Sequence, residues 1–194
     1  MDIIVFDLGG VCIFNFQTIG KIALHYHLEE DDVYAEYMRS DIPLMEGAVT
    51  TKEWWKTASE KFGVDSDADP LVDLFTPYPN SPVLALVDEL RSHGKRVVCG
   101  SNTCEGHWQK MNACASLESH FDRCYLSQRM GLAKPDVRFF DYILRAEGVE
   151  ASRALFIDDT KANIEGAEKA GMCGFLFRDE FSWAALDKLR SIVL

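Results

Sequence analysis

Short apolar runs separated by helical patterns constrain the fold of this chain more than any other feature. The first run, Ile3-Ile4-Val5-Phe6, is rich in β-branched residues and ends at Asp7. A continuous apolar run bounded by turn residues is typical of a strand buried on both faces. Similar runs follow at residues 96–99, 123–126, 154–157 and 174–177, and amphipathic spacing predicts helices over residues 83–93, 105–117, 136–147 and 161–170. The alternation predicts a parallel sheet covered by helices on both faces.

Residues 15–80 interrupt this alternation. The spacing there predicts helices over residues 19–26, 31–38, 51–62 and 68–75, with no convincing strand. A turn-rich segment, Thr76 to Pro82, then returns the chain to the alternating pattern. We therefore expect an α/β, Rossmann-like core made of residues 1–14 and 81–194. Residues 15–80 would form a small inserted helical cap over the ligand site.

The charge of the chain bounds its partners. The formal net charge is -11 at pH 7, and such a surface repels phosphate backbones and anionic lipid. We therefore expect neither nucleic-acid nor membrane binding. The N-terminus shows no basic region or long apolar stretch of a secretory leader, and no apolar run approaches the roughly 20 residues of a membrane span.

The six cysteines form no C-x-x-C pair, so we expect them to be reduced in a cytoplasmic protein. Cys104 and His107 have the spacing of a metal pair, but no second pair completes a zinc site, and ordinary packing is the favoured interpretation.

Four polar clusters fall at the expected carboxyl ends of strands. Each has an ordinary structural explanation. Asp7 before Gly9-Gly10 fits a turn, Ser101 fits a helix N-cap, Lys134 fits a solvated loop, and Asp158-Asp159 fits the start of a helix. Their order is the specific signal, because the carboxyl ends of parallel strands meet in one crevice. The clusters are Asp7-Leu8-Gly9-Gly10-Val11, Ser101-Asn102-Thr103, Lys134-Pro135, and Asp158-Asp159 with Asn163.

These four clusters resemble, in order, the four signature motifs of the haloacid dehalogenase-like (HAD) hydrolase superfamily. The resemblance covers nearly the whole chain, and the inserted helices are similar to the small C1-type cap of one subgroup. Four stretches are especially similar to the branch of glucose-1-phosphate phosphatases and N-terminal phosphatase domains of epoxide hydrolases: Phe6 to Val11, Gly100 to Thr103, Gly131 to Asp136 and Phe156 to Asp159.

The resemblance implies phosphoryl transfer to Asp7 as the nucleophile, a step that divides hydrolysis into two displacements. It also implies a Mg²⁺ ion bound by Asp7, the Gly9 carbonyl and Asp159, supported by Asp158 and Asn163. Ser101 and the backbone donors around Asn102 would bind the phosphoryl oxygens. Lys134 would pair with both Asp7 and phosphate, which offsets their repulsion. The expected substrate is a small phosphorylated metabolite, and the expected assembly is a monomer or a homodimer.

Gly9 departs from the family pattern, because most phosphatases of this family carry a second Asp at that position as the general acid and base. Such help is worth about 10²–10⁴-fold in rate. One hypothesis is a phosphatase that is slow, that uses good leaving groups, or that borrows an acid. Asn15, His25 and His27 are positional candidates for this acid, although a solvated or packed role is favoured for both histidines.

Two alternatives remain open. A binding protein would retain the fold and the metal but lack turnover. A 2-haloacid dehalogenase would need neither an acid at Gly9 nor magnesium, but the adjacent carboxylates Asp158 and Asp159 argue against it, because they repel each other without a cation. Aromatic residues of the insert either shape a substrate pocket or, as we favour, form the core of the cap; they are Phe16, Tyr34, Tyr37, Trp54 and Trp55.

Overall fold

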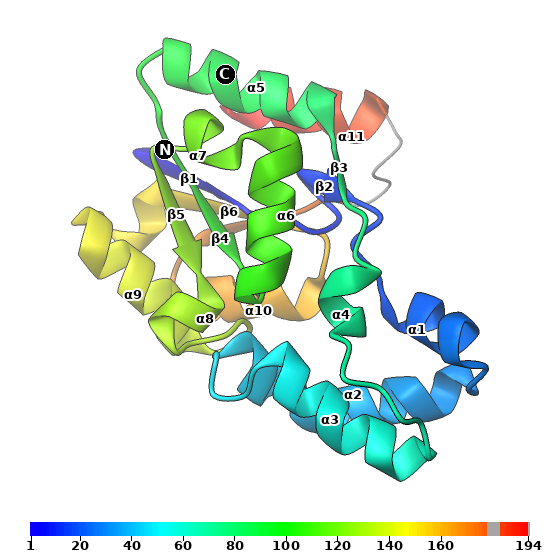
Figure 1. Ribbon diagram of the computed structural model, residues 1–194. Coiled ribbons are helices and arrows are strands. Elements are labelled where there is room, and N and C mark those ends of the chain that lie inside the picture. Colours follow the sequence, from blue (N-terminus) through cyan, green and yellow to red (C-terminus); the bar gives the residue numbers. More distant parts are fainter. Residues whose placement is uncertain (178–182, 194) are drawn as a thin grey trace.

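The computed structural model describes residues 1–177 and 183–193 and contains the expected parallel sheet (Figure 1). Within the described residues the sheet has five strands in the order β5-β4-β1-β6-β7. All four neighbouring pairs are parallel. The strands are β1 (Ile3–Phe6), β4 (Arg96–Ser101), β5 (Arg123–Leu126), β6 (Ala154–Asp158) and β7 (Cys173–Leu176). The prediction of an α/β fold with a parallel sheet is therefore confirmed.

Alternate residues of each strand pack against helices on opposite faces of the sheet. Ile4 and Phe6 belong to a cluster with α5 (Ser81–Ser92), α6 (Glu105–Ala115), α7 (Leu117–His120) and α11 (Trp183–Val193). Ile3 and Val5 belong to a second cluster with α9 (Val137–Glu147) and α10 (Lys161–Lys169). All four residues of β1 are buried, so both faces of this strand are covered. This explains why the run from Ile3 to Phe6 contains no polar side chain.

The inserted segment, residues 15–80, forms helices α1 (Ile19–Tyr26), α2 (Glu30–Met45), α3 (Thr51–Phe62) and α4 (Pro70–Asp73). These helices lie together at the carboxyl end of the sheet (Figure 1) and share their own hydrophobic cluster, which includes Trp54 and Trp55. Thr50 caps α3 through a reciprocal pair with Glu53: the Thr50 hydroxyl accepts from the Glu53 N–H, and the Glu53 carboxylate accepts from the Thr50 N–H.

Three predictions for this segment were wrong. Helix α2 continues beyond Met38 to Met45, because Leu44 is buried in the helical cluster. Helix α4 is short because Pro70 occupies its first turn, so it cannot begin at Ala68. A strand is also present, since β3 (Tyr78–Pro79) pairs antiparallel with β2 (Ile13–Phe14), a long-range contact with no local signal.

The core differs from prediction mainly at element ends. The predicted helix over residues 105–117 is divided at Ser116, which has a left-handed backbone (φ 50) and separates α6 from α7. The short elements α8 (Ser127–Met130) and η1 (Ala151–Arg153) were not predicted. Across residues 1–177 and 183–193, no helix combines the length and apolar character needed to cross a bilayer.

Candidate functional site

Strands β1 and β6 bring the first and fourth clusters together. Phe6 pairs with Ile157 in the register of these strands, and the Asp7 backbone N–H donates to the Ile157 carbonyl at 2.9 Å. The residues that follow, Asp7 and Asp158, are thereby placed side by side at the carboxyl edge of the sheet. Carboxylate oxygens of Asp7, Asp158 and Asp159 all lie within 4.8 Å of one another.

Lys134 reaches the same point from the loop before α9. Its Nζ lies 2.7 Å from Asp7 Oδ1 and 2.7 Å from Asp158 Oδ2, and its side chain is 1% exposed. The solvated-loop interpretation of Lys134 is therefore wrong, because the side chain is buried between two carboxylates. Burial opposes its charge, but these two carboxylates hold the pKa of Lys134 above its usual value.

Asn102 positions Lys134 through the backbone. The Asn102 Nδ2 donates to the Lys134 carbonyl at 2.9 Å, and the Lys134 N–H donates to Asn102 Oδ1 at 2.8 Å. This bidentate contact occupies the side-chain amide of Asn102. A contribution of Asn102 to phosphate binding would therefore come from its main chain.

Asp158 accepts hydrogen bonds from three other groups besides facing Asp7. Its Oδ1 accepts from the Thr160 N–H at 2.8 Å, Lys134 binds Oδ2, and Asn163 Nδ2 donates to both oxygens at 3.1 and 3.0 Å. These bonds orient the carboxylate from the first turn of α10. Asp159 is less enclosed, and its Oδ1 accepts from the Thr160 hydroxyl at 3.2 Å.

The carboxylates carry more negative charge than Lys134 offsets. When all are ionised, three carboxylates and one ammonium leave two negative charges in a buried space. Burial raises the pKa of Asp7 to about 7, against the lowering effect of Lys134, and burial with Asp158 nearby raises the pKa of Asp159. Compact oxygen donors with unbalanced negative charge fit a hard divalent cation such as Mg²⁺.

Ser101 and Thr103 lie at and just beyond the carboxyl end of β4, the strand beside β1. Ser101 is 2% exposed and is the last residue of the strand. The N-cap of α6 is Cys104, so the structural interpretation of Ser101 as an N-cap is wrong, because the chain makes a three-residue loop first. The Thr103 N–H donates to the Ser127 hydroxyl at 3.0 Å, which fixes this loop against the start of α8.

Gly10 is a site residue that motif reasoning treated only as part of a turn. It has φ +72, and a Cβ there would lie 2.2 Å from Asp159 Oδ2. The close approach of the Asp159 carboxylate to the β1 loop therefore requires glycine. The Gly9-Gly10 doublet was the available signal, but only the tertiary contact shows which glycine is needed for space.

The three candidates for a borrowed acid face solvent or have other partners. His25 and His27 are exposed at the end of α1, and Asn15 Nδ2 donates to the carbonyl and hydroxyl of Thr76 at 2.8 and 3.0 Å. No hydrogen bond or ion pair within residues 1–177 and 183–193 joins these three side chains to Asp7. Cys104 and His107 are likewise packed residues, and His107 Nε2 lies 2.7 Å from the Leu71 carbonyl.

The aromatic residues of the inserted segment divide into two groups. Trp54 and Trp55 are buried in the helical cluster, as favoured. Phe16, Tyr34 and Tyr37 line a pocket of about 330 Å³ with residues of α1, α4 and α6, and Tyr37 also packs against the helical cluster, with its ring edge-on to Trp54.

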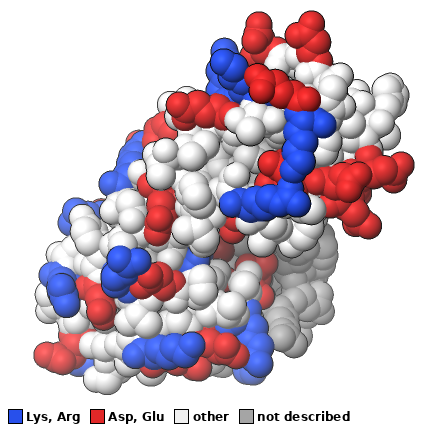
Figure 2. Space-filling model, turned by 90° about the horizontal axis from the view of Figure 1, so that it is seen from below, with Lys and Arg blue, Asp and Glu red and all other residues white. Residues whose placement is uncertain are grey.

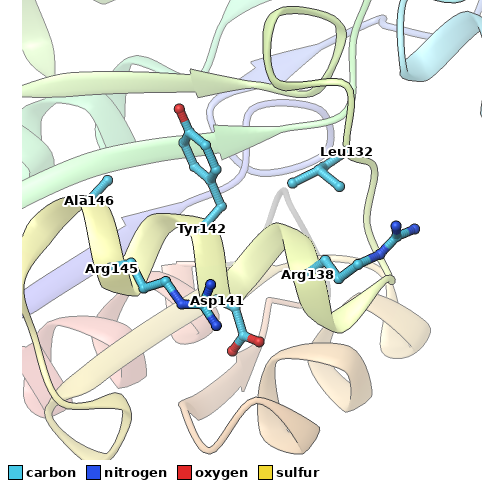
Figure 3. A pocket seen from close by; sticks show the side chains of 6 residues that line it. All are labelled: Leu132, Arg138, Asp141, Tyr142, Arg145 and Ala146. Carbon is cyan, nitrogen blue, oxygen red and sulfur yellow. The ribbon is translucent and has the colours of Figure 1, made fainter.

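A larger depression, of about 580 Å³, lies along α9 (Figure 3). Tyr142 rises toward the sheet, while Arg138, Asp141 and Arg145 lie along the helix. None of its lining residues belongs to the four clusters. On the lower face of the molecule, basic and acidic side chains are interspersed (Figure 2).

Comparisons with known proteins agree with this geometry. The family model for haloacid dehalogenase-like hydrolases matches residues 1–171. Phosphatase MT3486 of Mycobacterium tuberculosis is 37% identical over 101 residues, which cover 51% of this chain and 45% of that protein. The D-ribitol-5-phosphate phosphatase of Bacteroides thetaiotaomicron is 24% identical over 195 residues, with 93% of each chain covered. The chain spans about half the length of several curated relatives that it matches.

Among solved structures, the HAD family enzyme BT-2542 of Bacteroides thetaiotaomicron, in complex with magnesium and inorganic phosphate, superposes with a TM-score of 0.77. The match covers 96% of this chain and 98% of that one at 23% identity, which shows a shared fold. The parallel sheet, the order of the four clusters and the family match over residues 1–171 lead to one conclusion: this chain belongs to the haloacid dehalogenase-like hydrolases.

Proposed function

We propose that this protein is a magnesium-dependent phosphatase that hydrolyses a small phosphorylated metabolite through an aspartyl-phosphate intermediate on Asp7. The observation that carries the proposal is the group of carboxylates formed by Asp7, Asp158 and the half-buried Asp159, with the Lys134 ammonium held against the first two. Relatives named as phosphatases and a magnesium- and phosphate-bound structural neighbour support it. The proposal places the protein in the cytoplasm as a monomer or a homodimer.

Asp7 and Asp159 would hold the Mg²⁺ ion together with the Gly9 carbonyl, and Asp158 and Asn163 would support them from the start of α10. A bound Mg²⁺ supplies positive charge that offsets the repulsion between the Asp7 carboxylate and an anionic substrate. Lys134 adds a second positive charge, already held against Asp7. Ser101 and the main chain of Asn102 would donate hydrogen bonds to the phosphoryl oxygens.

Inserted helices α1–α4 would act as a cap, so that their movement relative to the core, residues 1–14 and 81–194, would control entry of water and substrate. The protein differs from most phosphatases of this family in having glycine, not aspartate, at position 9. A Cβ added there would meet the Phe16 ring at 3.4 Å, an ordinary van der Waals contact.

Phosphate release from p-nitrophenyl phosphate, with and without Mg²⁺, tests the proposal. We expect magnesium-dependent release that Asp7→Asn abolishes. We also expect Gly9→Asp to increase the rate most for alkyl phosphates, whose leaving groups need a proton. If the natural protein binds Mg²⁺ but releases no phosphate, and Gly9→Asp creates activity, the protein is a binding protein on the same fold, and the phosphatase proposal is wrong.

A further inference from the structure

The pocket of about 330 Å³ beside Phe16 is lined largely by rings and aliphatic side chains. Phe16 and Ile19 come from the start of the inserted segment, Tyr34 and Tyr37 from α2, Leu71 from α4 and His107 from α6. The His107 ring is stacked on Phe75 at 3.9 Å between centroids, and its Nε2 lies 2.7 Å from the Leu71 carbonyl. A volume of this size suits one small ring system.

Phe16 connects this pocket to the nucleophile. Its ring atoms lie 3.4 Å from where a Cβ on Gly9 would stand, and Gly9 is two residues from Asp7. The same ring lines the pocket. One aromatic side chain therefore both contacts the loop that carries Asp7 and lines the pocket, and it lies beside the position of the missing acid.

Glu30 supplies a negative group to the same pocket. Its two carboxylate oxygens lie 3.1 and 3.2 Å from where a Cβ on Gly20 would stand, and both residues line the pocket. A carboxylate in this position repels a leaving group that carries its own negative charge. Glu30 is exposed, so this repulsion is modest, and we expect the pocket to disfavour carboxylated and doubly phosphorylated substrates.

The chemistry at Gly9 limits the leaving group independently of the pocket. Without a side-chain acid, the departing oxygen leaves as an anion. A phenol has a pKa of about 10, whereas water, which an aliphatic alcohol resembles, has a pKa near 15.7. An aryl oxide is therefore the better leaving group, because a phenol is a stronger acid than an aliphatic alcohol by several powers of ten.

From these observations, and resting on the proposed phosphatase activity, we infer that the preferred substrate is an uncharged aryl group esterified to phosphate, with its ring held against Phe16. An Asp7 carboxylate oxygen bonds to phosphorus as the phosphorus–oxygen bond to the ring breaks. The bonding pair stays on the aryl oxygen, which takes a proton from solvent. Water then displaces the Asp7 carboxylate from phosphorus, which releases phosphate and a proton.

Three substrates distinguish the contribution of the pocket from that of the phosphatase chemistry: phenyl phosphate, cyclohexyl phosphate and acetyl phosphate. Acetyl phosphate has a good leaving group but no ring. We expect Asp7-dependent hydrolysis of acetyl phosphate and of phenyl phosphate, and at least 100-fold lower kcat/KM for cyclohexyl phosphate. We expect Phe16→Leu, which retains an apolar side chain, to lower kcat/KM for phenyl phosphate by about 3- to 10-fold, the range of an aromatic pair. The same variant should change kcat/KM for acetyl phosphate by less than twofold.

A pair of variants tests whether the Glu30 carboxylate discriminates against negatively charged leaving groups. Glu30→Gln should raise kcat/KM for 4-carboxyphenyl phosphate at least threefold relative to phenyl phosphate. Glu29→Gln, at the neighbouring position that is not among the residues lining the pocket, should leave this ratio unchanged. Leu24→Ala, at a position 78% exposed on α1, is the control for folding of the inserted segment.

The outcomes distinguish the two proposals. If Asp7 is not required for hydrolysis of acetyl phosphate, the phosphatase proposal falls and the aryl inference falls with it. If acetyl phosphate is hydrolysed through Asp7 but Phe16→Leu lowers the rate for both substrates equally, or Glu30→Gln leaves the carboxyphenyl ratio unchanged, the phosphatase stands and the aryl pocket is overturned.

Discussion

Lys134 Nζ lies 2.7 Å from Asp158 Oδ2, and the two side chains are 1% and 0% exposed. This buried pair also carries the Asp7 contact at 2.7 Å, so one ammonium offsets two carboxylates. Removing one partner of a buried ion pair leaves an uncompensated charge, which typically costs about 3–5 kcal/mol.

We therefore predict that Lys134→Met lowers the free energy of unfolding by about 3–5 kcal/mol at pH 7.5 without metal, and removes activity. Urea denaturation measures the first effect. The double variant Lys134→Met/Asp158→Asn should recover part of the loss, because it also removes one of the facing charges. If the free energy of unfolding of Lys134→Met is within about 1 kcal/mol of that of the natural protein, the ion pair is not important for stability.

Asp7 predicts a particular dependence of stability on pH. Its pKa of about 7 in the folded protein is above the ordinary value of 3.8, chiefly because it is buried. Between these values the folded state keeps a proton that the unfolded state has released. The contribution of Asp7 to stability therefore falls as the pH rises from about 4 to 7, and is level beyond that range.

Asp7→Asn removes this contribution. We predict that the stability difference, variant minus natural protein, increases from pH 4 to pH 7 by up to about 1.4 kcal/mol for each pH unit. Denaturation in EDTA at several pH values measures it. The difference between the two proteins is the relevant quantity, because the other titrating groups are common to both. A difference that stays constant over this range would contradict the assignment.

Gly10 is predicted to be required for metal binding. Gly10→Ala places a methyl group 2.2 Å from the normal position of Asp159 Oδ2 and strains a backbone at φ +72. Gly131 also has a positive φ, +66, but a Cβ there meets nothing within 4 Å, so Gly131→Ala reports the strain alone. We expect Gly131→Ala to cost about 1–2 kcal/mol of stability and to bind Mg²⁺ normally.

Gly10→Ala should lower the stability of the fold more than Gly131→Ala does. It should also weaken Mg²⁺ binding at least tenfold, as measured by calorimetric titration. Equal Mg²⁺ affinities in the two variants would mean that the Asp159 carboxylate moves without consequence, and that Gly10 serves only the turn.

Magnesium should stabilise the folded protein, since a ligand that binds only the folded state adds about 2.7 kcal/mol at 100 times its dissociation constant. For a chain of this size that corresponds to a Tm increase of roughly 5–10 °C. Asp159→Asn should lose most of the increase, whereas Asp65→Asn, an exposed carboxylate in the inserted segment, should retain it. Thermal melts with Mg²⁺ and with EDTA make the comparison. An undiminished increase in Asp159→Asn would place the metal elsewhere.

The sequence alone determined the parts of the fold that depend on local periodicity. The apolar run Ile3–Phe6 predicts β1 because four consecutive buried residues occur only where both faces of a strand are covered. Asp7, Ser101, Lys134 and Asp158 were predicted to converge because they follow successive strands and parallel strands end at one edge of a sheet. The structure brings Asp7, Lys134 and Asp158 into direct contact.

Tertiary structure decided what depends on contacts between distant segments. The pairing of Ile13–Phe14 with Tyr78–Pro79 has no local signal, since each strand is two residues long and its partner lies across the whole inserted segment. Likewise, the burial of Lys134, the engagement of Asn102 with its backbone, and the need for glycine at position 10 are properties of a shared space. Local patterns give the type of residue at each strand end, but charge balance and available volume arise only when the chain has brought those ends together.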